Sequence, residues 1–409
     1  MPILKEYEQL KKSDICCDLA GLEKYIKKNN LSNALKITPS GINANYHVGV
    51  IKYKKFQLQI LPKLINQEED NDNQILKNLV FMLSYTKKLE IKTTNNALLD
   101  SDRNPFLEIL IKEFAVSLFD ALKRLSPKNY VREEDNLNYL KGKIVFSENI
   151  RYNNVNQSKF YCQYDDFSEN NTLNQLFLFV SDCLYQISSN RENKRILKLI
   201  INYFADVQKV RFDRFSCEKI QLTRNQVLFK KPFNLAKMFI EHSSIDLSKN
   251  SFENISLIWD MNKLFEEFIF EVLRKNNTDA NWIFTAQKGK RLLHSDNNKI
   301  RNTYVDIFAE NKENKIIIDT KYKKFENTAD FSNADVFQVS TYCLLHNTSH
   351  AVLLYPQWGK DKPDIPGYYL NTDSEKIRIY FKTINLKYKD LKNSISDIKR
   401  ELNEIISSC

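Results

Sequence analysis

The chain has 409 residues, of which 42% are hydrophobic and 27% are charged, which predicts a globular protein of two or three domains and excludes a disordered chain. Its formal net charge of +10 fits a polyanionic partner such as a nucleic acid. Seven cysteines without a CxxC pair, five histidines without a zinc-binding pattern, and the absence of a signal peptide or an apolar run of ~18 residues predict a reduced, cytoplasmic protein without a membrane span.

The first part of the chain reads as a short helix and a small β-rich module. The helix is expected within residues 14–29. Alternating apolar and polar residues predict three strands, at residues 34–39, 46–53 and 56–61. A turn at Lys54-Lys55 would join the last two strands, and an acidic, Asn-rich linker follows at residues 66–73. These features predict a β-rich module of about residues 30–65.

Helices and one further β-type region come next. Apolar periodicity predicts helices at residues 74–85, 105–125, 174–188, 191–207 and 234–242. Residues 130–152 read as strands with a turn near Gly142. The basic and aromatic residues of this region leave two interpretations open, a solvated sheet face or a surface for nucleic acid or a partner: Lys141, Lys143, Arg151 and Tyr152.

A polar, Ser- and Asn-rich segment at residues 245–253 is expected to be the domain boundary. Residues 1–245 then form one region, made of the β-rich module and a helical and β part at 74–245. Residues 250–409 form the other. Its predicted elements are a helix at 256–275, strands at 282–287, 303–309 and 316–321, a helix at 333–346, strands at 350–355 and 376–381, and a helix at 394–406. This order predicts an α/β (α+β) domain with a mixed sheet.

The candidate site lies in residues 301–321, which read as two strands joined by a polar turn. Asp319 and Lys321 follow a run of three isoleucines and share one face of the second strand, because residues i and i+2 point the same way. Asp306 on the first strand reaches the same place if the strands pair. Carboxylate oxygens suit Mg²⁺, and a neighbouring lysine can orient an attacking water.

A plainer interpretation of the acid-x-Lys pattern remains open. The pattern also occurs elsewhere in this lysine-rich chain, for example at Glu90-Ile91-Lys92 and Asp397-Ile398-Lys399, where solvated ion pairs are expected. Only Asp319-Thr320-Lys321 follows a buried-strand run and has a strand-borne aspartate shortly upstream. Both the catalytic and the ion-pair interpretation therefore stand at this point.

Two further sequence features bear on function. On the helix predicted at residues 333–346, Asp335, Gln338 and Tyr342 share one face, which is either a solvent-facing stripe or a support beside the metal site. None of the seven glycines forms a phosphate-binding loop, and no Gly-Lys-Ser/Thr occurs. We therefore expect that this chain hydrolyses no nucleoside triphosphate itself.

Taken together, these motifs resemble the PD-(D/E)xK nucleases with a helical Gln-x-x-x-Tyr motif, and more closely the McrC family, the nuclease subunits of McrBC-type modification-dependent restriction systems. The nuclease motifs are Leu264-Phe265-Glu266, Val305-Asp306, Ile318-Asp319-Thr320-Lys321, and Gln338 with Tyr342. The N-terminal pieces are Val48-Gly49-Val50-Ile51, Ile60-Leu61-Pro62-Lys63 and the turn at Leu140–Gly142. Val305 stands where the family often has proline, a residue without a chemical role.

The resemblance implies a Mg²⁺-dependent DNA endonuclease subunit that docks on an AAA+ GTPase resembling McrB, stimulates GTP hydrolysis and cleaves DNA carrying modified cytosine. Residues 1–245 would dock on the GTPase, and residues 250–409 would cleave, with self-association of the nuclease domain for double-strand cuts.

The resemblance also implies a role for each site residue. Asp306 and Asp319 would bind Mg²⁺ together with the carbonyl of Thr320, and Lys321 would position the water. Glu266, or Glu267 in its place, would complete the metal shell. Two helical residues would support the site or the DNA backbone, namely Gln338 and Tyr342.

Two alternatives stay open. The chain could be a non-cleaving adaptor that only activates a partner ATPase or GTPase, but the intact Asp-Asp-Lys set favours an enzyme. It could also be a stand-alone repair nuclease of the same fold, but the large N-terminal half argues against that.

Overall fold

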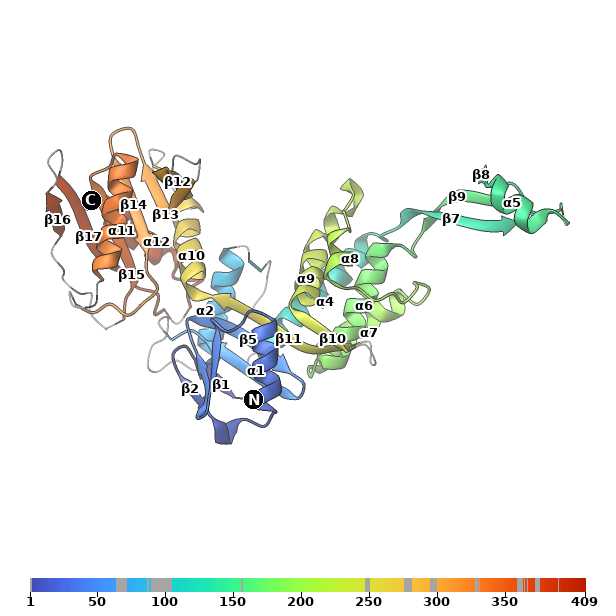
Figure 1. Cartoon of the computed structure of the whole chain (residues 1–409), viewed down its shortest axis with the longest axis horizontal. Coiled ribbons are helices and arrows are strands. Elements are labelled where there is room, and N and C mark those ends of the chain that lie inside the picture. Colours follow the sequence, from blue (N-terminus) through green and yellow to red (C-terminus); the bar gives the residue numbers. More distant parts are fainter. Residues whose placement is uncertain are drawn as a thin grey trace. The chain divides into compact units, whose positions relative to one another are not determined.

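The chain folds as two compact units, whose elements are labelled in Figure 1. The first unit comprises Met1–Ile51, Lys55–Asn96 and Leu257–Cys409, and the second comprises Lys52–Lys54 and Ala97–Ser256. A computed structural model describes residues 2–63, 72–86, 88–89, 105–155, 157–246, 251–275, 282–294, 300–327, 330, 332–358, 363, 365, 367–371, 376–388 and 390–409. The N-terminal β-rich module thus shares a unit with the C-terminal sheet, which differs from the predicted division at residues 245–253.

The N-terminal module contains the three predicted strands and three short strands that the sequence did not predict. Its elements are β1 (Ile3–Lys5), β2 (Gln9–Lys11), the 3-10 helix η1 (Lys12–Asp14), α1 (Leu19–Lys28), β3 (Leu35–Thr38), β4 (Gly41–Ala44), β5 (His47–Tyr53) and β6 (Phe56–Leu61). The strands form a sheet of order β2-β4-β3 and most of a second sheet of order β1-β6-β5-β11-β10. The additional strands β1, β2 and β4 are too short, at three or four residues, to show a periodic pattern.

Gly49 shows why part of this module needs glycine. Its φ is +142°, and a Cβ at this position would lie 2.0 Å from the carbonyl oxygen of Leu257. Only a residue without a side chain lets β5 approach the neighbouring strand β11 (Ser251–Asp260) this closely. Lys54, in the predicted turn between β5 and β6, has a φ of +52°.

The second unit is a helical body from which a three-stranded β arm extends. Its elements are α4 (Pro105–Arg124), β7 (Asn129–Leu137), β8 (Lys143–Ile144), α5 (Phe146–Asn153), β9 (Phe160–Ser168), α6 (Thr172–Ile187), α7 (Arg191–Tyr203), α8 (Arg214–Glu218), η2 (Arg224–Phe229), α9 (Lys230–Glu241) and β10 (Ser243–Asp246). Figure 1 shows β7 and β9 running away from the helices, with β8 and α5 at their far end. The arm sheet has the order β7-β9-β8.

The structure corrects two predictions in this region. Residues 146–153 form a helix rather than strand, because Phe146 and Ile150 recur at the i,i+4 spacing of a helix. The segment predicted as the domain boundary at 245–253 contributes to the paired strands β10 and β11 (Ser251–Asp260), with residues 247–250 outside the described residues, and the two units meet slightly later, between Ser256 and Leu257. Polar composition concealed β11, whose Phe252, Ile255 and Leu257 are buried.

The C-terminal sheet has six strands in the order β12-β13-β14-β15-β17-β16. Its elements, with the helices that pack around it, are α10 (Met261–Lys275), β12 (Ile283–His294), β13 (Ile300–Glu310), β14 (Lys315–Thr320), α11 (Asn333–His346), β15 (His350–Pro356), β16 (Tyr368–Asn371), β17 (Lys376–Ile384) and α12 (Ile395–Ser407). The strands β12, β13 and β14 pair antiparallel, whereas β14, β15 and β17 pair parallel. The mixed α/β class is thereby confirmed, but the helix predicted from residue 256 begins only at Met261, where β11 ends.

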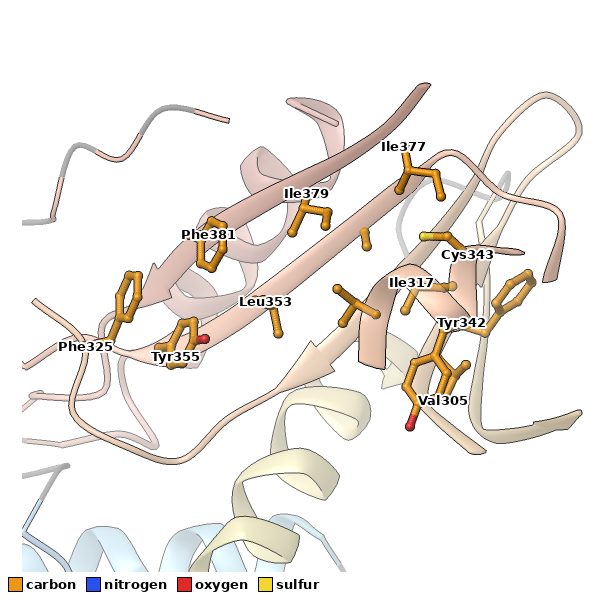
Figure 2. Close-up of a cluster of buried hydrophobic side chains, with 13 residues drawn as sticks. Val305, Ile317, Phe325, Tyr342, Cys343, Leu353, Tyr355, Ile377, Ile379 and Phe381 are labelled. Atoms are coloured by element: carbon orange, nitrogen blue, oxygen red, sulfur yellow. The ribbon is translucent and has the colours of Figure 1, made fainter. Parts of the chain in front are cut away.

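A hydrophobic core joins α11 to this sheet (Figure 2). Val305, Ile317 and Leu353 contribute from three neighbouring strands, and Tyr342 and Cys343 contribute from α11. A second contact joins α2 (Asp72–Tyr85), whose Phe81 and Tyr85 pack on Phe268, to α10. Burial of these side chains holds the strand ends that carry the candidate site.

Within the described residues, the helices are all too short or too polar to cross a lipid bilayer.

Glu108 is the polar centre of the helical body in the second unit. Its buried carboxylate accepts hydrogen bonds from Ser188 Oγ (2.8 Å), from Ser189 N (2.6 Å) and Oγ (3.0 Å), and from Asn193 Nδ2 (2.8 Å). These bonds fix the loop that connects α6 to α7 and give its buried donors an acceptor.

Replacing Glu108 with alanine should lower the free energy of unfolding by about 3 kcal/mol, because several buried donors lose their acceptor at once. Urea denaturation of the full chain measures this loss. The control is Glu192→Ala, which removes an exposed ion pair with Arg195 and should leave the unfolding midpoint unchanged. Equal effects of the two substitutions would contradict this assignment.

Candidate active site

The register of β13 and β14 brings the two predicted aspartates together. Ile307 pairs with Ile318 in the antiparallel ladder, so the next position along places Asp306 opposite Asp319. Asp306 Oδ2 accepts hydrogen bonds from the backbone N–H (2.9 Å) and the hydroxyl (3.0 Å) of Thr320. The carboxylates therefore meet at one end of the sheet, as the sequence predicted they would if the strands paired.

Asp319 is the most deeply buried of the candidate residues. Its side chain has no exposed surface, and burial, reinforced by the charge of Asp306, raises its pKa to about 7. The ammonium of Lys321 lies 2.7 Å from Oδ2, whereas Oδ1 has no hydrogen-bond partner among the described residues. A buried carboxylate oxygen without a partner is an acceptor available for a cation.

Lys321 heads a hydrogen-bonded chain that runs onto α11. Its ammonium donates to Gln338 Oε1 (3.0 Å), and Gln338 Nε2 donates to the hydroxyl of Tyr342 (2.6 Å). Burial alone would lower the pKa of Lys321, but the charge and hydrogen bond of Asp319, together with the charges of Asp306 and Asp335, outweigh burial and raise the pKa. The ammonium is therefore held in its charged form.

The residues of the predicted helical face contact two different places. Gln338 and Tyr342 reach the candidate site, with the Tyr342 ring buried in the core of Figure 2. Asp335 instead pairs with Lys323, at 2.6 Å. Since two of its three residues contact the site or the core, this face is no solvent-facing stripe.

Glu266 and Glu267 on α10 point to different places. Burial and the nearby charge of Asp306 raise the pKa of Glu266 to about 7, which places this carboxyl in the same electrostatic neighbourhood as the aspartates. Glu267 pairs with Lys88 at 2.9 Å. The structure thus favours Glu266 as the acidic residue that α10 contributes.

Gln287 is a site neighbour that the sequence did not indicate. It lies between the pairs Ala286↔Ile307 and Lys288↔Val305, so it stands opposite Asp306 on β12. Its amide donates to Glu266 Oε1, and its φ of +50° is rare for a residue other than glycine. Strained backbone of this kind gathers at functional sites, but a glutamine in a strand carries no sequence signal.

The donor set of this site fits a hard divalent cation. The described residues contain no cluster of three or more His, Cys, Asp or Glu side chains that could hold a metal ion by itself. Mg²⁺, however, usually takes only one or two carboxylates, together with water and substrate. Asp306 and Asp319 supply two carboxylates, both with raised pKa. A cation between them would relieve their mutual repulsion, which Lys321 and the hydrogen bonds from Thr320 already offset in part.

Comparison with known proteins adds the following findings. The family model described as "McrBC 5-methylcytosine restriction system component" matches residues 42–356. The fold matches a chain in the refined half-complex of Thermococcus gammatolerans McrB AAA+ hexamers with bound McrC, with 21% identity, a TM-score of 0.76 and 99% coverage of both chains. The cryo-EM structure of the Thermococcus gammatolerans McrBC complex matches with 24% identity and a TM-score of 0.55, over 68% of this chain and 88% of that chain. No curated protein matches.

The raised pKa of Asp319 makes stability depend on pH in a defined direction. An aspartate in an unfolded chain has a pKa near 3.9, so the folded state binds the proton more tightly. Without divalent cations, the free energy of unfolding should fall as the pH rises from about 4 to about 7 and then level off. Asp319→Asn, which carries no charge at any pH, should reduce this fall and be the more stable protein above pH 7.

Mg²⁺ should stabilise the wild-type chain, because a ligand that binds only the folded state raises its stability, and should have no such effect on Asp319→Asn. Urea unfolding at pH 5 and pH 8, with and without Mg²⁺, measures both effects. The control is Asp397→Asn at an exposed carboxylate paired with Arg400, which should behave as wild type. Equal Mg²⁺ stabilisation of Asp319→Asn and wild type would remove Asp319 from the metal site.

Proposed function

The chain belongs to the McrBC 5-methylcytosine restriction system component family, and from this we propose that it is the Mg²⁺-dependent DNA endonuclease subunit of a McrBC-like restriction complex. It would cleave DNA carrying modified cytosine while docked on an AAA+ GTPase. The observation that carries the proposal is the convergence of Asp306, Asp319 and Lys321 at one strand end, with one oxygen of Asp319 left without a partner.

In the proposed phosphodiester hydrolysis, each residue of the site would have its own task. When bound, Mg²⁺ would supply Lewis-acid activation of the scissile phosphate and of the attacking water. Asp306 and Asp319 would hold it, assisted by the Thr320 carbonyl. Lys321, kept charged by Asp319 and aligned by its bond to Gln338, would orient the water and offset charge on the phosphorane-like transition state.

Glu266 would contribute from α10. Its pKa near 7 lets it exchange a proton at neutral pH, so it can either complete the ligand set or accept a proton from a bound water. Gln287 would keep this carboxyl turned towards Asp306 through its hydrogen bond.

The partner is proposed from two observations. The matched Thermococcus gammatolerans structure is described as McrB AAA+ hexamers with bound McrC, and the present chain resembles that fold over 99% of its length. The chain itself contains no Gly-Lys-Ser/Thr phosphate loop. An AAA+ GTPase resembling McrB would therefore supply the nucleotide chemistry and the movement along DNA.

The β arm of the second unit, residues 129–168, offers a docking surface for that GTPase. Its large side chains are unusually exposed, at 71% for Phe146, 63% for Ile150 and 61% for Tyr139. Apolar side chains gathered on one projecting element indicate a protein interaction site. Figure 1 shows this arm reaching away from the helices of its own unit.

The two alternatives fit less well. A non-cleaving adaptor would need neither a buried aspartate beside a second aspartate nor a lysine aligned on one of them. A stand-alone nuclease would need no projecting arm with exposed aromatic residues.

Asp306→Ala, Asp319→Ala and Lys321→Ala should each lower Mg²⁺-dependent cleavage at least about a hundredfold while the chain stays folded. Lys321→Ala should spare Mg²⁺ binding more than either aspartate change, and Glu266→Gln should lower the rate less completely than Asp319→Ala. Cleavage of methylated plasmid by the complex measures this. The matched control is Asp397→Ala, in a surface acid-x-Lys motif. Full cleavage by Asp319→Ala would rule the site out.

Cleavage and GTPase activation should be separable. The Asp319→Ala chain should stimulate the partner's GTPase at full strength, because its arm is intact. The double variant Phe146→Ser/Ile150→Ser should fold, since both side chains are exposed, yet lose most of the stimulation. Steady-state GTP hydrolysis with each purified chain distinguishes the two. Stimulation that survives in the arm variant would place the docking surface elsewhere.

A further inference from the structure

A carboxyl group near the N-terminus is fully buried in the first unit and does not belong to the site described above. Glu6, directly after β1, has no exposed surface. Its Oε2 accepts the hydroxyl of Tyr322 (2.9 Å) and the backbone N–H of Lys63 (3.0 Å). Its own backbone N–H donates to the carbonyl of Leu61 (3.0 Å). Glu6 is thus fixed to the end of β6 and extends one bond to the loop that follows β14.

Tyr322 receives that bond next to the candidate catalytic residues. It follows Lys321 in the chain, and it is among the largest fully buried side chains of the protein. Its ring meets that of Phe265, with the centroids 5.8 Å apart, and Phe265 directly precedes Glu266. One phenol ring therefore lies between the N-terminal module and two residues of the candidate site.

The backbone beside Tyr322 is held from the sheet as well as from the module. Lys321 N donates to the carbonyl of Leu354 (2.9 Å), which secures the strand side of the loop. One residue further, the Tyr322 hydroxyl donates to Glu6 (2.9 Å), which ties the same backbone to the module. A ring of this size moved by even a fraction of an ångström would shift the lysine beside it, and catalysis tolerates little misplacement.

We propose that the Glu6–Tyr322 hydrogen bond is a positioning link through which the N-terminal β-rich module holds Lys321 and Glu266 in their reactive geometry. Glu6 and Tyr322 are positioning residues and touch no substrate. The inference rests on the proposed nuclease function. It makes residues 1–63 part of the nuclease, in place of a purely docking role for the front of the chain.

The chemistry of Glu6 gives the link a specific test. Burial raises the pKa of Glu6 to about 8, so the carboxyl is mostly neutral at pH 7, and a glutamine can reproduce its accepting oxygen. Glu6→Gln should therefore keep cleavage within about twofold of wild type. Glu6→Leu, of similar size but without an acceptor, and Tyr322→Phe, which lacks only one oxygen, should each slow cleavage about tenfold.

A double-mutant cycle separates the link from general destabilisation. Because both single changes break the same bond, Glu6→Leu/Tyr322→Phe should be no slower than either alone. The matched control is Asn78→Leu, which removes a buried side chain bonded to the carbonyl of Tyr388 and the N–H of Leu391. It should lower thermal stability comparably but leave the cleavage rate intact.

The experiment uses the full chain with its AAA+ partner, GTP, Mg²⁺ and methylated DNA, and measures single-turnover cleavage, GTPase stimulation and melting temperature. All the variants should stimulate the GTPase normally. Wild-type cleavage by folded Glu6→Leu and Tyr322→Phe, additive losses in the double variant, or failure of Glu6→Gln to retain activity would overturn the proposal. If Glu6→Leu does not fold, Tyr322→Phe and Glu6→Gln still decide it.

Hydrogen exchange keeps this test independent of the proposed function. Amides from Lys321 to Phe325 should exchange faster in Glu6→Leu and Tyr322→Phe than in wild type or Asn78→Leu. If wild type and Asp319→Ala cleave equally little, the nuclease assignment fails by itself. Unchanged exchange in this segment would defeat the positioning link, whatever the cleavage assay shows.

Discussion

The candidate site depends on the repulsion between two carboxylates that a strand register forces together. The antiparallel pairing of β13 and β14 sets Asp306 opposite Asp319. The side chain of Asp319 is fully buried, and that of Asp306 is partly buried. Burial raises the pKa of both carboxyls, and the charge of Asp306 raises the pKa of Asp319 further, so a proton or a positive charge nearby stabilises the pair. Lys321 supplies one such charge. Two carboxylates face this single lysine, and the negative charge left over is the physical reason that a divalent cation suits this site.

The rigidity of the site comes from the hydrophobic layer behind it. Val305 and Ile317, next to the acidic positions, pack in the same core as Tyr342 of α11 (Figure 2). The chain Lys321–Gln338–Tyr342 thereby ends on a side chain that the core holds in one position. The packed core therefore fixes Tyr342, and through its hydrogen bonds Tyr342 fixes the positions of Gln338 and Lys321.

The division of the protein does not follow the order of the chain. The first unit takes residues from both ends, and the helical second unit is inserted between them. This arrangement places a β-rich module from the N-terminus beside a sheet from the C-terminus, with Glu6 and Tyr322 in direct contact. The arm and its exposed aromatic residues belong to the inserted unit, so partner docking and cleavage would draw on different units.

Much of the secondary structure of this protein follows from the local periodicity of its sequence. The limits of α11, most strands of the sheet, and the shared faces of Asp319 with Lys321 and of Gln338 with Tyr342 all follow from residues close in sequence. Strand and helix periods are local properties, so a single sequence displays them. The sequence did not reveal the strands β10 and β11 or the helix α5 of the arm, because their amino-acid composition fits more than one secondary structure.

Only the tertiary structure decided which distant residues meet. It pairs Glu267 with Lys88 and leaves Glu266 beside Asp306, it sets Gln287 opposite Asp306, and it joins Glu6 to Tyr322. Such contacts depend on strand register and on packing between separate segments of the chain, and no local pattern encodes these.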